Sequence, residues 1–383
     1  MGPLAALAVL TTASLDAQAL RLGFGGAVAR MGDDIVVAES NNLVGPSTVY
    51  LYRQSGDAWA EVQGLVPENW QAEDHFGTAL AVAGGLLVVS APGQDGGRGA
   101  VYTYRREGDG LVQDGRIAFD DAAEGARLGV ALAADAGTLL VGGEDGSVRA
   151  FTRTGGTWEA AGALAGDDVG EEDRFGAALA VQGDVALVGA PGQATGEVAG
   201  TGAAYVFERA DGTWSEAAKI ALRGLEENDA FGSSVALNDA DEAFVGAVNL
   251  NGNGEVFSFA RDPESGEWGL SGRLAAFAPS GQDRFGATIL ASDEEILVGG
   301  ERSHGFSGAV YVFERNEDGD ITSSRFFSRE DGLQGTTFAR AFAVAGDIAV
   351  VGAPGDDNAA GTALVFARGD DGWRQAAVLA SDV

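Results

Sequence analysis

The chain has 383 residues, of which 45% are hydrophobic, so it can bury a sizeable core and is not expected to be disordered. Its 57 acidic residues outnumber 24 basic ones, and a net charge of −33 argues against nucleic acid and anionic lipid as partners. The absence of cysteine excludes disulfides and thiolate metal sites, so stability has to come from the fold itself.

The N-terminal segment has the pattern of a signal peptide. An apolar run over residues 3–15 precedes Ala17-Gln18-Ala19, which fits the small-x-small rule for cleavage. The run is too short to cross a bilayer, and no Lys or Arg precedes it. We predict a signal peptide over residues 1–19, a secreted, cell-surface or periplasmic location, and no direct membrane insertion. The alternative is that this segment supplies a closing β-strand.

A repeat of about 52 residues then fills the chain from residue 20 to residue 383. Its units start at a Phe-Gly pair or a near equivalent, with spacings of 52, 52, 47, 56, 54 and 53 residues. The starts are Phe24, Phe76, Leu128, Phe175, Phe231, Phe285 and Phe338. Self-similarity of this kind indicates one supersecondary unit per repeat and leaves no room for another domain.

The fourth unit shows the internal order most clearly. Apolar runs over 177–181 and 185–188 flank a Gly-Asp turn, a third run follows over 203–209, and a fourth segment starts at Trp214. Short β-rich runs separated by Gly and Asp turns indicate four antiparallel strands. Seven such units predict an all-β fold, a seven-bladed β-propeller in which each sheet packs on its neighbours.

The repeat resembles the FG-GAP repeat of integrin α-subunit N-terminal domains and of bacterial extracellular proteins. Phe-Gly is followed about 14 residues later by Gly-Ala-Pro, which is intact at Gly189-Ala190-Pro191 and Gly352-Ala353-Pro354 and nearly so at Ser90-Ala91-Pro92. We assign structural roles to the motif: phenylalanine fills the wedge between blades, glycine allows close backbone approach, and proline ends the second strand. The residues concerned are Phe24, Phe76, Phe175, Phe231, Phe285, Phe338, Pro92, Pro191 and Pro354.

Antiparallel order places the loops before strand one and after strand two at one end of the propeller. These loops are long and unlike one another, whereas the turns at the other end are short, and variable loops on a rigid scaffold are where recognition usually resides. We therefore expect ligand binding at the end that carries the FG and GAP motifs. The candidate residues there are Asp74, His75, Asp95, Asp121, Glu144, Asp168, Glu172, Glu197, Glu227, Asn251, His304 and Asp356.

Two further patterns concern charge. An Asp lies two residues before Phe at Asp74, Asp173, Asp229 and Asp283, a position suited to capping turn amides. An Arg closes the third strand of every unit, and we predict that these arginines pair with carboxylates of neighbouring turns at the short-turn end. The seven are Arg53, Arg105, Arg153, Arg209, Arg261, Arg315 and Arg368.

Integrin-type repeats often carry a calcium loop between strands one and two, but here that connection has shrunk to a tight hairpin. No cofactor and no metal ligand is therefore predicted. Binding of a cation such as Ca²⁺ at the acidic end is the alternative that the sequence leaves open.

The sequence contains no cysteine nucleophile, no Gly-x-Ser-x-Gly elbow and no phosphate-binding glycine loop. We predict a non-enzymatic recognition or adhesion module that binds an extracellular protein or glycan. The alternatives are a secreted glycosidase or lyase acting on polysaccharide, and a structural component of a surface assembly.

Overall fold

The computed structural model describes residues 21–42, 45–56, 58–196, 198–316, 319–356 and 360–380. The predicted signal peptide over residues 1–19 lies outside this part of the chain. Among the described residues, no helix is both long enough and apolar enough to cross a membrane.

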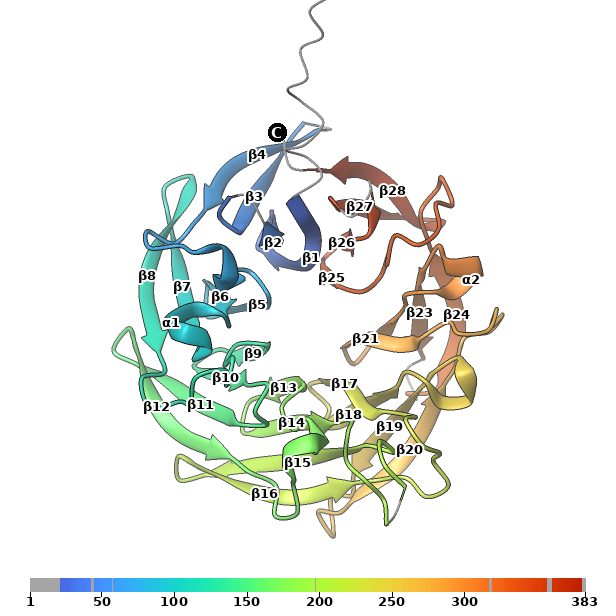
Figure 1. The fold of residues 1–383 in the computed structure, drawn as a ribbon. Helices are drawn as coiled ribbons and strands as arrows, with labels where there is room; N and C mark the ends of the chain where they lie inside the picture. Colours follow the sequence, from blue (N-terminus) through green and yellow to red (C-terminus); the bar gives the residue numbers. More distant parts are fainter. Residues whose placement is uncertain are drawn as a thin grey trace, which may run out of the picture.

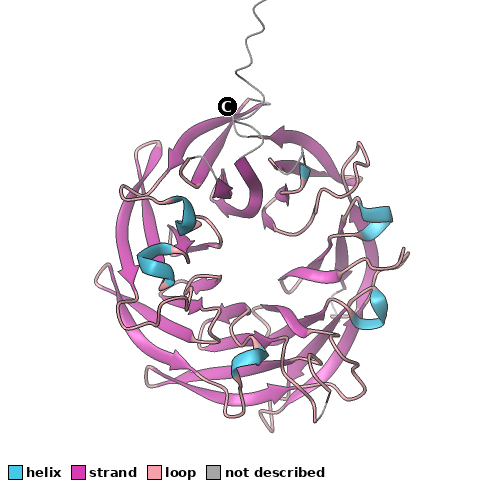
Figure 2. Ribbon diagram, in the orientation of Figure 1, coloured by secondary structure: helices cyan, strands magenta, loops and turns pink. Residues whose placement is uncertain are grey.

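The described chain forms seven sheets of four antiparallel strands, arranged in a ring (Figures 1 and 2). The predicted all-β, seven-bladed propeller is confirmed. Every sheet consists of four consecutive strands, with the first innermost and the fourth at the outer rim. The strands of blades 1 to 4 are β1 Arg21–Met31, β2 Asp34–Asn42, β3 Thr48–Ser55, β4 Ala58–Leu65, β5 Leu80–Ala83, β6 Leu86–Ala91, β7 Ala100–Glu107, β8 Gly110–Ala118, β9 Ala131–Asp135, β10 Thr138–Gly142, β11 Val148–Thr154, β12 Thr157–Leu164, β13 Ala178–Gln182, β14 Val185–Ala190, β15 Ala203–Ala210 and β16 Thr213–Ile220.

The strands of blades 5 to 7 are β17 Phe231–Leu237, β18 Glu242–Ala247, β19 Glu255–Arg261, β20 Trp268–Leu274, β21 Phe285–Ala291, β22 Glu295–Gly300, β23 Ala309–Arg315, β24 Ile321–Phe327, β25 Phe342–Ala345, β26 Ile348–Ala353, β27 Thr362–Gly369 and β28 Gly372–Leu379. The short helical turns are η2 Ala72–Asp74, α1 Gln94–Gly97, η3 Glu171–Asp173, η4 Leu250–Gly252 and α2 Ser303–Phe306. All of these turns lie in loops at one end of the propeller, which we call the long-loop end. The opposite end, which carries the hairpins between strands one and two and between three and four, is the short-turn end.

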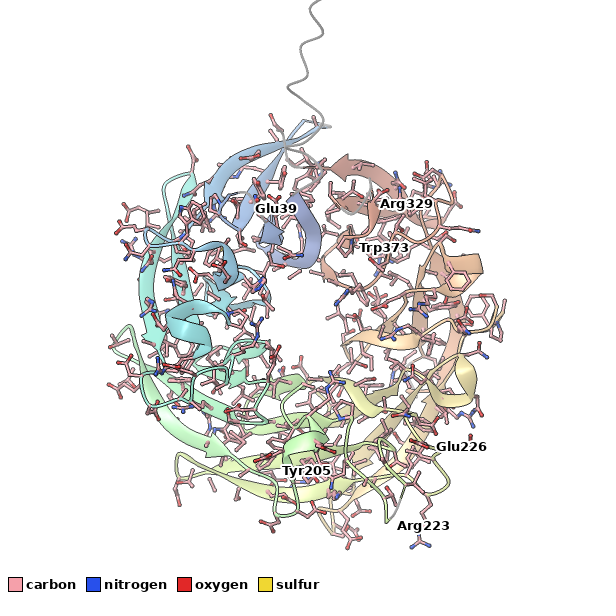
Figure 3. All side chains as sticks on the ribbon, in the orientation of Figure 1. Glu39, Tyr205, Arg223, Glu226, Arg329 and Trp373 are labelled. Carbon is pink, nitrogen blue, oxygen red and sulfur yellow. The ribbon has the colours of Figure 1, made fainter. Side chains whose placement is uncertain are left out.

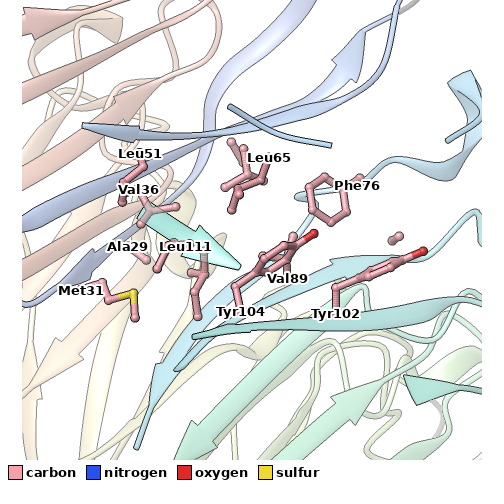
Figure 4. Packing of buried hydrophobic residues seen from close by; sticks show 14 of the residues in the cluster. Ala29, Met31, Val36, Leu51, Leu65, Phe76, Val89, Tyr102, Tyr104 and Leu111 are labelled. Carbon is pink, nitrogen blue, oxygen red and sulfur yellow. The ribbon is translucent and has the colours of Figure 1, made fainter. Parts of the chain in front are cut away.

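The phenylalanine of the motif packs inside its own blade, on aromatic rings of the third strand. Phe175 meets Tyr205 and Phe207 with ring centroids 5.4 and 6.0 Å apart, both edge to face. Phe76 packs in the same way on Tyr102 and Tyr104 (Figure 4). All six motif phenylalanines are at most 1% exposed, because the preceding blade covers what their own sheet leaves open.

The two glycines of the motif meet between neighbouring blades. A Cβ at Gly189 of blade 4 would lie 2.0 Å from the carbonyl oxygen of Gly232 in blade 5. Gly232 itself has a φ of +90°, and a Cβ on it would lie 2.2 Å from the Ala203 carbonyl oxygen of blade 4. The Phe-Gly glycine of one blade and the Gly-Ala-Pro glycine of the preceding blade are therefore both needed for close approach.

The same contact closes the ring. A Cβ at Gly352 of blade 7 would lie 1.9 Å from the Gly25 carbonyl oxygen of blade 1, and the Phe24 N–H donates to the Ala360 carbonyl at 3.0 Å. Blade 7 has its own fourth strand, β28, so within the described chain closure rests on packing between the first and last blades (Figure 1). Pro92, Pro191 and Pro354 each follow directly on the last residue of a second strand.

The predicted arginine contacts at the short-turn end are confirmed, since each of the seven arginines lies within 4 Å of a carboxylate. Five of them reach a neighbouring blade, as Arg261 does to Glu208 at 2.8 Å and Arg315 to Glu242 at 2.5 Å. The carboxylate partners of Arg105 and Arg209 lie in their own blades. These pairs are mostly part-exposed, and each contributes about 0–1 kcal/mol.

Candidate functional site

The two ends of the propeller differ in their loops as the antiparallel order requires. At the short-turn end the connections are tight, for example Gly183-Asp184 between β13 and β14. At the long-loop end they are extended, as over 191–202 in blade 4 and 301–308 in blade 6. The long-loop end therefore offers more loop surface than the short-turn end.

Buried polar contacts fix the long loops to the third strands. The Tyr205 hydroxyl of β15 contacts both Gln193 and Asp168 of the loops at 2.7 Å, and the Tyr102 hydroxyl of β7 donates to Gln94 (Figure 3). Within blade 1, the Tyr50 hydroxyl donates to Glu39 of β2 at 2.8 Å. Burial, followed by the hydrogen bond to Asp168, raises the pKa of Tyr205, so this hydroxyl keeps its proton. The loops are thus held in place by the scaffold, which favours a preformed binding surface.

The axis of the ring is apolar. A cavity of about 530 Å³ runs along the innermost strands and is lined mainly by aliphatic side chains of six blades, among them Val82, Leu179 and Leu290. Glu295 and Ser292 are the polar members of this lining. Among the described residues, the axial funnel therefore lacks the clustered carboxylates, arginine and tyrosine that polysaccharide chemistry on the axis would require.

A polar cavity of about 980 Å³ lies instead in blade 2, at the long-loop end. We call it the blade 2 pocket. It is bounded by the loops before β5 and β9, the turn α1, and the strands β7 and β8. Its lining residues are Glu68, Asn69, Gln71, Glu73, Asp74, Gly93, Gln94, Asp95, Gly96, Gly97, Tyr102, Gln113, Arg116 and Arg127.

Asp74 is the most deeply placed carboxylate of the blade 2 pocket, with 4% of its surface exposed. Its Oδ2 accepts hydrogen bonds from the Gln71 N–H at 2.8 Å and from Gln94 at 3.4 Å. Burial raises the pKa of Asp74; the nearby carboxylates Asp95 and Glu73 add to this, and the two hydrogen bonds oppose it. Its Oδ1 accepts no hydrogen bond from any described residue and is available to a ligand.

Arg116 forms the opposite wall of the blade 2 pocket. It is the cross-strand partner of Tyr102, lies over the Tyr102 ring with 5.7 Å to the centroid, and pairs with Asp95. Tyr102 donates to Gln94 at 2.5 Å, which links this wall to Asp74. Arg116 keeps a high pKa despite burial, through its hydrogen bonds to Tyr102 and Asp95. The pocket thus combines planar acceptors, planar donors and one aromatic ring in a connected network.

The capping role predicted for the aspartate two residues before Phe is confirmed at all four positions. Asp173 accepts the Gly170 N–H at 2.6 Å, and Asp229 and Asp283 accept the equivalent N–H in blades 5 and 6. The residue between aspartate and phenylalanine is left-handed each time, for example His75 with a φ of +51° and Arg174 with +55°. Asp74 therefore has a structural role that it shares with Asp173, and a position in the pocket that Asp173 lacks.

Comparison with known families gives the decisive observation. The FG-GAP repeat family matches residues 59–104 and 158–207. Each matched segment begins in the fourth strand of one blade and ends in the third strand of the next, β4 to β7 and β12 to β15. The chain is a seven-bladed propeller in which these two segments match the FG-GAP repeat. No curated protein matches it.

Solved structures share the propeller fold of this chain at low identity. A Lactobacillus plantarum protein is 15% identical with a TM-score of 0.62, covering 91% of this chain and 95% of that one. A candidate 6-phosphogluconolactonase from Bacteroides uniformis is 11% identical with a TM-score of 0.55, covering 79% and 88%. The computationally designed Ika8 protein is 18% identical with a TM-score of 0.52, covering 91% and 84%. At these identities the likeness concerns the fold alone.

Three of the candidate residues come together in the propeller. Asp74 and Asp95 line the blade 2 pocket, and Glu144 pairs at 3.1 Å with Arg127, a lining residue. His75 lies beside Asp74, with its Nδ1 3.3 Å from the Ser40 carbonyl oxygen of blade 1.

The remaining candidates are spread around the long-loop end of the propeller, over blades 3 to 7. Asp121 pairs with Arg149, Asp168 with Lys219, and Asp356 with the buried Arg329 (Figure 3). Asn251 donates to Glu255. His304 stacks on Phe326 at 4.1 Å. Glu172 lies in η3, Glu227 in the exposed loop before β17, and Glu197 falls outside the described residues.

The sequence expectations missed most of the wall of the blade 2 pocket, including Glu68, Gln94, Tyr102, Gln113 and Arg116. The hairpin at Gly108-Asp109 sets the register of β7 and β8 only as far as Tyr104 and Gln113. A β-bulge between Thr103 and Tyr104 then shifts the pairing by one residue and brings Arg116 opposite Tyr102, so the hairpin alone would not have predicted this wall. Gln94 and Glu68 lie in loops whose paths the sequence does not fix.

Proposed function

We propose that this protein is a non-enzymatic, secreted recognition module that binds an extracellular glycan in the blade 2 pocket. The observation that carries the proposal is the lining of this pocket, which is polar and connected and has one aromatic ring. Hydroxyl-rich sugars need paired acceptors and donors in fixed positions, and Asp74, Gln94 and Arg116 supply them. Secretion is part of the proposal because of the residue pattern over 1–19.

The charge of the pocket narrows the glycan class. Asp95 is paired with Arg116, and Arg127 with Glu144, whereas Glu68, Glu73 and Asp74 have no cationic partner among the described residues. An anionic sugar such as a uronate or a sulfated unit would face three unpaired carboxylates. Neutral or amino-bearing oligosaccharides are therefore the expected ligands.

The test is a glycan array of neutral, amino-bearing and anionic oligosaccharides, followed by titration of the hits against matched variants. Asp74→Asn keeps the acceptor for the Gln71 N–H but removes the charge, and Arg116→Met removes the donor wall. Each should weaken binding by about tenfold or more. Asp173→Asn makes the same change at a capping aspartate outside the pocket and should leave affinity unchanged. Absence of any glycan hit, or equal loss in Asp173→Asn, would overturn the proposal.

A second candidate function is favoured by one observation, the raised pKa of Asp74. A buried carboxyl with a raised pKa beside Asp95 and Tyr102 has one property of a general acid for glycosidic bond cleavage. The test is release of reducing ends from polysaccharide. If the wild type and Asp173→Asn release them and Asp74→Asn does not, the proposed function becomes hydrolysis in place of recognition.

A further inference from the structure

A second surface at the long-loop end, in blade 6, differs chemically from the blade 2 pocket. Phe277, Phe306 and Phe326 are 45%, 44% and 41% exposed, and His304 stacks on Phe326 at 4.1 Å. Phe277 and Phe326 have ring centroids 5.7 Å apart. We call these four residues the aromatic patch. They come from three segments, the loop before β21, the turn α2 and the strand β24.

Comparison with blade 2 shows that the fold does not require these aromatics. Phe326 is the cross-strand partner of Tyr311, just as Arg116 is that of Tyr102. His304 of α2 is at the position equivalent to Asp95 of α1, and the two residues have φ values of +54° and +55°. The Asp95–Arg116 ion pair of blade 2 is thus replaced by a His304–Phe326 stack in blade 6. The same backbone conformation therefore accommodates an ion pair in blade 2 and an aromatic stack in blade 6.

Phe306 carries the strongest sign that the patch has a role beyond folding. Its φ is +74°, a left-handed conformation that is strained for a bulky residue, and its ring is exposed. The equivalent residue of blade 2 is Gly97, with a φ of +78°. An exposed phenylalanine at a position whose geometry suits glycine makes no contribution to the core that would offset the strain.

We propose that the aromatic patch docks a polypeptide partner that presents apolar side chains flanked by basic residues. The rings do not form a flat platform for a sugar, because the planes of Phe277 and Phe326 meet at 44° and His304 covers one face of Phe326. A net charge of −33 repels anionic membranes and opposes association of a second copy. The same charge attracts a basic partner, while the apolar contact is made at the patch.

The patch also extends toward a neighbouring loop. The Phe306 carbonyl accepts the Gly335 N–H at 2.8 Å, and Leu333 in that loop is 49% exposed. An apolar side chain of the partner would therefore meet Phe306 and Leu333 together. This inference is independent of the glycan pocket, since no residue of the patch lines the blade 2 pocket.

The experiment uses synthetic peptides in which Phe or Leu alternates with Arg, with two matched sets in which Ser replaces the apolar residues or Glu replaces the arginines. The full chain should bind the first set, and both matched sets should bind about tenfold more weakly or worse. The double variant His304→Asp/Phe326→Arg copies the ion pair of blade 2 and should fold normally while losing this preference.

A single variant separates docking from stability. Phe306→Gly should leave the melting temperature unchanged or raise it, and it should weaken binding of the first peptide set by about tenfold. Equal binding of the apolar and Ser-substituted peptides would show charge attraction alone and overturn the proposal. So would self-association in sedimentation runs that the double variant abolishes, or a glycan hit lost in Phe306→Gly but retained in Asp74→Asn.

Discussion

At the residue scale, the motif phenylalanines show how one side chain serves two blades. Phe175 is 1% exposed and contacts two aromatic rings of its own sheet, while the neighbouring blade covers the rest. Phe175→Ala should cost about 3–5 kcal/mol of unfolding free energy, because it leaves a cavity that the rigid sheets cannot fill. Denaturant unfolding measures the loss. Leu270→Ala, at a residue 59% exposed, is the control and should change stability by about 0.5 kcal/mol or less.

A second residue-scale consequence concerns acid. Two hydrogen bonds from Arg329 lower the pKa of Asp331 from 3.8 to about 2. A carboxyl whose pKa is lower in the folded state stabilises the fold above its ordinary pKa, and that contribution is lost as the pH falls toward 2. Asp331→Asn should therefore be less stable than wild type at neutral pH, and the difference should shrink below pH 4. The effect is small because the Asp331 side chain is 51% exposed. A stability difference between wild type and Asp331→Asn that stays constant from pH 7 to pH 2 would contradict this prediction.

At the scale of the element, the Phe-Gly and Gly-Ala-Pro segments act between blades, although the sequence shows them as a pair within one repeat. Gly189→Ala would place a Cβ 2.0 Å from the Gly232 carbonyl oxygen and should destabilise by about 1–3 kcal/mol through displaced backbone. Gly269→Ala, in β20 with open space around the new Cβ and an ordinary φ, is the matched control and should be neutral or slightly stabilising. Denaturant unfolding measures both variants. Equal unfolding midpoints would mean that neighbouring blades can move apart at this contact without loss of stability.

The same scale explains what could be predicted. Strand order, hairpins and the capping role of Asp74 follow from local rules, because each depends on neighbours in sequence. The blade 2 pocket depends on the paths of three loops and on the side chain opposite Tyr102. Local composition marks Asp74 as an acidic loop residue, yet it does not distinguish Asp74 from Asp168 or Asp121, whose charges are matched by Lys219 and Arg149.

At the scale of the whole molecule, the repeat length predicts the ring because seven equal units must cover one another. The aromatic patch was not predictable in this way. His304 stands out in the sequence only as one of two histidines, and the exposure of Phe277, Phe306 and Phe326 appears only when three segments meet. Repeats predict the common scaffold well, whereas departures from the repeat, where function is expected, need the assembled structure.

The charge of the whole molecule sets its response to salt. With 57 acidic and 24 basic residues, the folded chain concentrates like charges, and salt screens their repulsion. Salt also weakens the arginine pairs of the short-turn end, but those contribute only about 0–1 kcal/mol each. The melting temperature should therefore rise as sodium chloride increases from low ionic strength to about 1 M, where the screening length is about 3 Å. Sodium sulfate at equal ionic strength separates screening from the additional strengthening of apolar burial. A melting temperature that falls with sodium chloride would mean that the ion pairs between blades outweigh the self-repulsion of the acidic surface.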